Sequence, residues 1–195
     1  MQKKYMIFTV ILLAGLLAGC AAKKAEEKVM PVAEQKEVTQ ETELKTPDWF
    51  LNLPSDNENF YAATTALGWD LQNAINMAKQ DALTDIAGQV SVHVSSMFKR
   101  FREEVVTEET AELQSQTNSV SKSVVDETIS GCQIVKQDKG RENGKFRVYI
   151  LMKMPKQTAN ASMISKIKAD KGMYALFRAS QGFQELETEV QKSKG

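Results

Sequence analysis

Residues 59–88 read NFYAATTALGWDLQNAINMAKQDALTDIAG and predict the central unit of the fold. The first nine, residues 59–67, are rich in aromatic and β-branched side chains, which predicts a strand. Gly68 ends that strand, and Asp70 predicts a helix N-cap because its carboxylate can accept a first-turn amide. A strand followed directly by a helix is therefore the first unit of the fold.

The helix after Asp70 carries apolar residues at helical spacing. They include a row of small residues four apart: Ala74, Ala78 and Ala82. Small residues at this spacing let a helix lie close against a sheet. Gly88 stands where a left-handed C-terminal residue is expected, so we predict that the helix ends there.

Two further elements are predicted beyond Gly88. The valines Val90, Val92 and Val94 alternate with Ser91, His93 and Ser95, which is typical of a half-buried strand. Residues 107–127 favour a weakly amphipathic helix. Its apolar face consists of Leu113, Val120 and Val124.

Residues 131–138 and 145–154 form a candidate hairpin around the connection 140–144. One face of its second arm carries Phe146, Val148, Ile150, Met152 and Met154. Pro155 ends this arm, because proline cannot donate to a strand ladder. The order of elements predicts an α+β fold: a small, mostly antiparallel sheet with one or two packed helices, plus a long C-terminal helical tail.

Residues 156–195 form the predicted tail. Its apolar stripe, at spacings of three and four, consists of Leu176, Ala179, Phe183, Leu186 and Val190. Gly172 and Gly182 weaken the helix, by about 1 kcal/mol each. The stripe can pack back on the domain or pair with another subunit, and the sequence leaves both alternatives open.

The N-terminus predicts a secreted lipoprotein. Lys3 and Lys4 are followed by an uncharged run, residues 5–19, that is too short to cross a bilayer as a helix. The run ends in Leu17-Ala18-Gly19-Cys20, which resembles a bacterial lipobox. The resemblance implies that residues 1–19 are a signal peptide, that cleavage precedes Cys20, and that Cys20 is lipidated. An ordinary signal peptide that happens to precede a cysteine is the alternative.

The residues after Cys20 indicate where the protein goes. An Asp directly after the cysteine retains such lipoproteins on the inner membrane, whereas Ala21 and Ala22 follow here. We therefore expect an anchor in the outer membrane of a two-membrane bacterium, with the domain on the periplasmic face. Three acyl chains on one cysteine suffice for stable anchoring.

Residues 20–46 are predicted to be a disordered, charged tether. Eleven of the 26 residues after Cys20 are charged and none is aromatic, so this stretch cannot bury enough apolar surface to order itself. A partly helical stalk is the alternative. Order is expected from Pro47 onwards, where Trp49 and Phe50 supply large apolar area and Trp49 is expected to cap one edge of the core.

Composition excludes several functional classes. The 195 residues contain 25 basic and 25 acidic side chains, which disfavours a nucleic-acid partner. After cleavage the balance becomes 23 against 25, and Cys132 is the one thiol left beside the lipidated Cys20. A single His, two Cys and no glycine-rich loop disfavour metal sites, thiol relays and nucleotide cradles. We expect no catalytic, cofactor-binding or metal-binding residues.

Four groups of residues could still carry chemistry, and each has a simpler interpretation. His93 is expected on a polar strand face with Ser91 and Ser95, too far from either for easy proton transfer. The carboxylate pairs Glu103-Glu104 and Glu108-Glu109 are expected to be solvated. The basic residues Lys99, Arg100 and Arg102, which alternate with Phe98 and Phe101, are expected at a strand end, with contact to anionic lipid as the alternative. Cys132 shares strand parity with Ile134 and is expected to be buried and inert, an intermolecular disulfide being the alternative.

Taken in order, these features resemble the LPP20 lipoprotein family. The resemblance is carried by the lipobox, the charged tether, Pro47-Asp48-Trp49-Phe50, the first strand with its alanine-rich helix, the 90–94 valines, and Tyr149-Ile150-Leu151. It covers about residues 47–155 and implies a small α+β domain without known catalysis. The same domain occurs in the flagellar accessory lipoprotein of the P type, whose subunits form rings or disks around the motor.

The leading functional expectation is a non-enzymatic structural or interaction module of the cell envelope. Its partners would be the outer membrane, through the lipid anchor, and envelope proteins or other copies of the chain. The alternatives are a flagellar-motor accessory lipoprotein that assembles into a ring or disk, and a periplasmic ligand-binding module.

Overall fold

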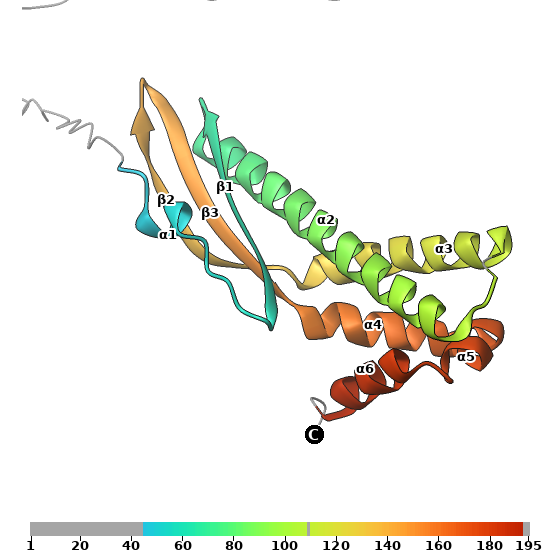
Figure 1. Cartoon of the computed structure of the whole chain (residues 1–195). Coiled ribbons are helices and arrows are strands. Elements are labelled where there is room, and N and C mark those ends of the chain that lie inside the picture. The colour runs from blue at the N-terminus through green and yellow to red at the C-terminus, as the bar shows by residue number, and fades with distance from the viewer. Residues whose placement is uncertain (1–44, 109, 193–195) are drawn as a thin grey trace, which may run out of the picture. The chain divides into compact units, whose positions relative to one another are not determined.

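A three-stranded antiparallel sheet in the order β1-β3-β2 forms one layer of the fold in the computed structural model (Figure 1). The strands are β1 (Asn59–Gly68), β2 (Gln133–Glu142) and β3 (Lys145–Pro155). The helices are α1 (Asp48–Leu51), α2 (Leu71–Val105), α3 (Ala111–Thr128), α4 (Lys156–Ala169), α5 (Lys171–Phe177) and α6 (Gln181–Lys192), with a single 3-10 turn at Ile129–Gly131. The α+β prediction is confirmed.

The structure describes residues 45–108 and 110–192. The predicted signal peptide 1–19, the lipidation site Cys20, nearly all of the 20–46 tether, and Glu109 lie outside these residues. No helix within the described ranges combines the length and the apolar character that a bilayer crossing requires.

The first strand and its helix cap are as predicted. Strand β1 runs to Gly68, and the Asp70 carboxylate accepts the backbone N–H of Asn73 at 2.8 Å. The three alanines are fully buried, and Thr64 of β1 donates to the Ala78 carbonyl at 2.6 Å. The small side chains thus bring the helix backbone within hydrogen-bonding reach of a strand residue.

The predicted helix end at Gly88 and the predicted strand at Val90, Val92 and Val94 are wrong. Helix α2 continues without interruption to Val105, so Gly88 lies inside it. Val90 and Val94 are buried while Val92 is 69% exposed, because Val90 and Val94 extend a buried row with four-residue spacing. Residues two apart on a strand share a face, but on a helix they lie about 200° apart.

The buried row of α2 also explains how one helix serves two layers. Its members are Ala74, Ala78, Ala82, Ile86, Val90, Val94, Phe98 and Phe101. A four-residue repeat exceeds the helical period of 3.6, so the row turns by about 40° per step around the axis. The N-terminal half of α2 therefore packs on β1 and β3, and its C-terminal half packs on α3, α4 and α6.

The hairpin is confirmed, with a shorter connection than predicted. Strand β2 extends through Gly140 to Glu142, and the turn consists of Asn143 and Gly144 alone. Both have positive φ, 52° and 75°, which a two-residue hairpin turn of type I′ requires and which Asn-Gly favours. Strand β3 ends at Pro155 as expected.

Helix α3 confirms the second predicted helix. It begins at Ala111 because Thr110 caps it, its side chain accepting the Leu113 amide at 3.2 Å. Val124 is buried, and Leu113 and Val120 pack partly buried against the same core. The predicted apolar face is therefore the face that packs.

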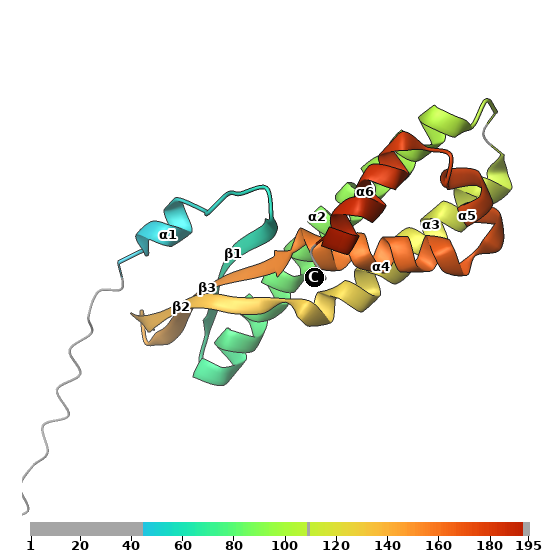
Figure 2. The ribbon, with the colours of Figure 1, turned by 90° about the horizontal axis from the view of Figure 1, so that it is seen from below.

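The C-terminal residues form three helices that pack on the rest of the chain (Figure 2). Asp170 ends α4 and caps α5, accepting the Met173 amide at 3.0 Å, and Ser180 accepts the Phe183 amide at 3.1 Å. Phe101 of α2 lies 5.9 Å from Phe177 and 5.7 Å from Phe183, measured between ring centroids. Of the predicted apolar stripe, Phe183, Leu186 and Val190 are buried in this packing, whereas Ala179 is exposed.

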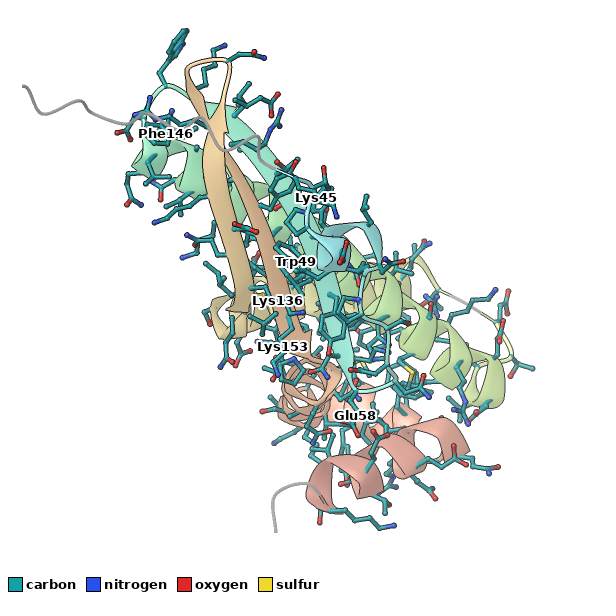
Figure 3. The ribbon with its side chains drawn as sticks, turned by 90° about the vertical axis from the view of Figure 1, so that its left-hand side faces the viewer. Lys45, Trp49, Glu58, Lys136, Phe146 and Lys153 are labelled. Carbon is teal, nitrogen blue, oxygen red and sulfur yellow. The ribbon has the colours of Figure 1, made fainter. Side chains whose placement is uncertain are left out.

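The two faces of the sheet are covered unequally. Helix α2 covers one face of β1 and β3, and α1 lies on the other, where Phe50 meets Tyr149 edge-on at 4.9 Å. Trp49 is half-buried beside Phe50, and in Figure 3 it lies over the sheet. Strand β2 projects beyond both coverings, and its first seven residues are exposed.

The expectation that Cys132 is buried is therefore wrong. Cys132 is half-buried and free, and Ile134, which should share its environment, is 41% exposed. Strand parity predicts burial only where a second layer covers the strand: Cys132, just before β2, packs against the edge of the core, whereas Ile134 on β2 lies beyond it. Burial does raise the pKa of the Cys132 thiol, which disfavours the reactive thiolate.

Candidate functional site: a groove beside the β1 edge

Among the described residues, a pocket of about 630 Å³ lies beside the free edge of β1. Its walls come from segments distant in sequence: the loop 52–58, the start of β1, the middle of α2, and Lys156 at the start of α4. The apolar part of the lining includes Leu53, Phe60 and Val92, and the polar part includes Asp56, Gln89 and His93. The pocket is thus largely apolar with a few polar groups, as binding sites usually are.

His93 lies in this pocket, on α2 rather than on the predicted strand. Its Nε2 is 2.7 Å from Oδ1 of Asn160 on α4, and its ring meets Phe60 edge-on at 5.5 Å. Ser91 and Ser95 are exposed on other sides of the helix, so the predicted grouping of the three residues on one face is wrong. This hydrogen bond ties α2 to α4. It does not point to acid-base catalysis, because an amide oxygen neither gives nor takes a proton at neutral pH.

Asp56 fixes the loop wall of the pocket to β1. Its carboxylate accepts the Tyr61 hydroxyl at 2.7 Å, the Asn59 backbone N–H at 2.7 Å and the Glu58 backbone N–H at 2.8 Å. The Tyr61 hydroxyl, followed by these other donors, lowers the pKa of Asp56 to about 2. Asp56 is therefore ionised at neutral pH and engaged in holding the loop.

The outer edge of β1 lines the pocket. Three hydrogen bonds establish which backbone groups of β1 face the pocket and which face β3. The Gln89 side chain donates to the Tyr61 carbonyl at 2.8 Å, and the Asn59 N–H donates to Asp56. The Glu58 carbonyl instead accepts the Lys156 N–H, at the β3 side. The backbone N–H and C=O groups of a strand point alternately to its two sides. Those of the odd-numbered residues of β1 therefore point to the open edge, and those of the even-numbered residues bond β3.

Two of the other sequence candidates, Glu104 and Arg100, hold α6 on α2. Glu104 accepts the Gly182 N–H at 2.9 Å and the Ser180 hydroxyl at 2.7 Å, which together lower its pKa and hold the start of α6. Arg100 links Glu104 to Glu185, and Lys99 pairs with Glu103 across one helical turn. The predicted strand end at Phe98 and Phe101 is wrong, because both residues belong to the last turns of α2. Their side chains are buried.

Sequence reasoning missed most of the pocket. Gln89, Lys156 and Asp56 had no motif, and only the fold brings them together. Lys156 lies with its Nζ 5.5 Å from the Phe60 ring centroid, a cation on an aromatic face. Within residues 45–108 and 110–192, no group of three or more His, Cys, Asp or Glu side chains is arranged to hold a metal ion.

Comparison with protein-family models identifies a family for this chain. The family model for LPP20 lipoprotein covers residues 47–154, from the start of α1 to the end of β3. A search of curated proteins finds no significant match. The matched region spans more than half of the 195 residues and includes the sheet, α2 and the β1 wall of the groove. The chain therefore belongs to the LPP20 lipoprotein family.

Proposed function

We propose that this envelope lipoprotein is anchored in the outer membrane through lipidated Cys20 and that its domain is a non-enzymatic interaction module in the periplasm. The observation that carries the proposal is the combination of family and position. A lipobox-like Leu17-Ala18-Gly19-Cys20 precedes the LPP20 match, which begins at residue 47. The residues at positions 21 and 22 are alanines, which supports the outer membrane as the destination.

The arrangement of the polar side chains supports a binding role over catalysis. The family is not known as enzymatic, and here His93 is bonded to an amide, Glu104 to a helix start, and Asp56 to its own loop. Each of these groups is committed to holding two segments together. The groove and the free strand edge beside it are the features that remain available for a partner.

The anchor is tested with Cys20→Ser in the native host. We expect the unaltered protein to incorporate an alkyne-tagged fatty acid and to band with the outer membrane in a sucrose gradient. The variant should lose the label and leave that fraction. Ala21→Ser, next to the lipidation site, is the matched control and should change neither result. A Cys20→Ser protein that still bands with the outer membrane would overturn the proposal.

The interaction role is tested in intact cells by cross-linking and mass spectrometry. We expect cross-links from lysines around the groove, such as Lys156, to one or a few defined proteins. Cross-links spread over abundant envelope proteins in proportion to their amounts contradict a specific module.

A further inference from the structure

The turn end of the sheet carries an exposed tryptophan that belongs neither to the groove nor to the core. Trp69 follows Gly68 at the end of β1 and is 76% exposed. The pairing of Gly68 with Phe146 places it beside the β2–β3 turn at Asn143 and Gly144. In Figure 1 the end of β1 and this turn lie at the same end of the sheet. An exposed tryptophan is typical of an interface, because its ring is apolar and its N–H is polar.

Two cations lie on aromatic rings at this end. The Nζ of Lys145 is 4.7 Å from the centroid of the Trp69 ring, and the Cζ of Arg141 is 4.4 Å from that of Phe146. We call these four residues the hairpin end. Each pair combines a positive charge with an apolar ring, a combination that is typical of protein surfaces in the lipid headgroup layer.

The positive charge of the hairpin end is not neutralised by its neighbours. Neither Arg141 nor Lys145 has an ion-pair partner among the described residues. The adjoining carboxylates are engaged elsewhere: Glu142 accepts two bonds from Arg147, at 2.8 and 3.0 Å, and Asp70 caps α2. The two cations therefore remain available to an anionic partner.

The chain enters the domain close to the hairpin end. The described residues begin at Lys45, and the Thr46 hydroxyl oxygen is 3.4 Å from that of Tyr149. Tyr149 lies three residues beyond Phe146 on β3, about 10 Å at 3.3 Å per residue. Figure 3 shows Lys45 beside the sheet, with Phe146 at the turn end. The N-terminal segment is thus joined to the sheet and not to the C-terminal helices.

This entry point brings the hairpin end near the proposed anchor. Cys20 precedes Lys45 by 25 residues. A flexible tether of this length, as the composition predicts, has a root-mean-square reach of about 28 Å. Tethering at this distance raises the effective concentration of lipid headgroups around the hairpin end, so a contact that is weak by itself becomes populated.

We propose that the hairpin end contacts anionic phospholipid headgroups of the membrane in which the chain is anchored. Trp69 enters the headgroup layer, and Arg141 and Lys145 bind lipid phosphate, since basic residues are attracted to an anionic surface and tryptophan favours this layer. This proposal rests on the proposed function, because it requires the lipid anchor. It adds a second membrane contact, which orients the domain.

A lipid surface fits this end better than a protein partner does. A stable protein interface buries roughly 1,000 Å² or more, with aromatic anchors near the centre of a patch. Trp69 instead lies at the end of the sheet, beside a projecting two-residue turn (Figure 1). A headgroup layer accepts a single projecting aromatic side chain, whereas a protein surface would need a pocket shaped for it.

The contact is tested on the mature, lipidated chain in phospholipid vesicles. Trp49→Phe leaves Trp69 as the one tryptophan. The vesicles contain phosphatidylethanolamine brominated near the headgroup, with or without phosphatidylglycerol. We expect quenching and a blue shift of Trp69 emission when phosphatidylglycerol is present. In the converse variant, Trp69→Phe, the remaining Trp49 should respond equally to the two vesicle compositions.

Charge neutralisation identifies the cations. Arg141→Gln and Lys145→Gln should each lower the ratio of contacting to free molecules, obtained from the quenched fraction, about fivefold. Lys122→Gln on α3 and Lys171→Gln on α5 remove the same charge far from the hairpin end and should leave the ratio unchanged. Circular dichroism establishes that every variant is folded.

Vesicle flotation separates this proposal from the anchor. A chain that floats with the vesicles while Trp69 stays unquenched rejects the contact and leaves the anchor intact. A chain that does not float rejects the anchor, and the contact with it. Equal quenching without phosphatidylglycerol excludes anionic headgroups as the partner and overturns the proposal. A photoreactive amino acid that replaces Trp69 in cells and links to one defined protein overturns it as well.

Discussion

His93 and Asn160 are 67 residues apart in sequence, yet Nε2 of the first lies 2.7 Å from Oδ1 of the second. The bond joins the middle of α2 to the first turns of α4, beside the pocket. Asn160 is buried, 5% exposed, so its oxygen has no alternative partner in water. The bond therefore holds a wall of the groove as well as the helix pair.

Replacing His93 with alanine should destabilise the fold by about 1–3 kcal/mol, because the buried Asn160 oxygen loses its donor. Urea unfolding followed by circular dichroism measures the free energy of unfolding. Ser91→Ala on the exposed side of α2 is the control, with an expected change within about 0.5 kcal/mol. Equal stability of the two variants would contradict the structural role assigned to His93.

Phe183→Ala should cost about 3–5 kcal/mol, because the ring is fully buried against Phe101 and its loss leaves a cavity. The same unfolding experiment applies, with Leu51→Ala, at a residue 68% exposed, as the control. A loss below about 1 kcal/mol for Phe183→Ala would mean that α6 is not held on α2 in solution.

Asp56 should titrate near pH 2, below its ordinary pKa, because the Tyr61 hydroxyl bonds its ionised form. A depressed folded pKa stabilises the fold above the unfolded pKa of about 4, and this contribution disappears as the pH falls through about 2. Carboxyl-carbon NMR should show the midpoint of Asp56 move upward in Tyr61→Phe and stay in place in Tyr174→Phe. An unchanged midpoint in Tyr61→Phe would assign the shift to other donors.

Gly144→Ala should destabilise the hairpin by about 1 kcal/mol, because the residue has a φ of 75° that a side chain disfavours. Asn143→Gly, at the neighbouring turn position with φ 52°, should change the free energy of unfolding by only a few tenths of a kcal/mol. Thermal unfolding compares the two variants. Equal effects of the two substitutions would indicate that the turn is not the two-residue type described.

Cys132 should react slowly with iodoacetamide in the folded chain, since burial raises the pKa of its thiol. The rate at pH 8 should rise markedly on unfolding in urea, which exposes the thiol. A folded-state rate as fast as that of free cysteine would make Cys132 a reactive site after all.

Sequence patterns predicted the elements whose periodicity has a single interpretation. Strand β1, the Asp70 cap and the β3 face follow from local chemistry. The 90–94 valines fit two periods at once, because Val90 and Val94 are both alternate strand residues and members of a four-residue helical row. The row that begins at Ala74 decides between them, and Gly88, an exposed helical residue, obscured its continuation.

The groove could not be predicted in the same way. Its polar groups come from residues 56, 89, 93 and 156, which no motif links. The sequence indicated His93 as a candidate but predicted a strand there. Nothing in the sequence pointed to Asn160 as its hydrogen-bond partner. Likewise, the parity of Cys132 and Ile134 gives their faces but not whether any layer covers them, which depends on where α2 lies.

Helix α2 is about 52 Å long by its 35 residues, and its buried row passes from the sheet to the C-terminal helices. A chain cut after Pro155 would keep every residue of the family match yet strip the covering from Phe98 and Phe101. The C-terminal half of α2 would then keep α3 as its cover but lose α4, α5 and α6, and the newly exposed apolar side chains would favour aggregation of the fragment. Proteolytic trimming of this lipoprotein is thus expected to proceed all or none, with no stable core released at the family boundary.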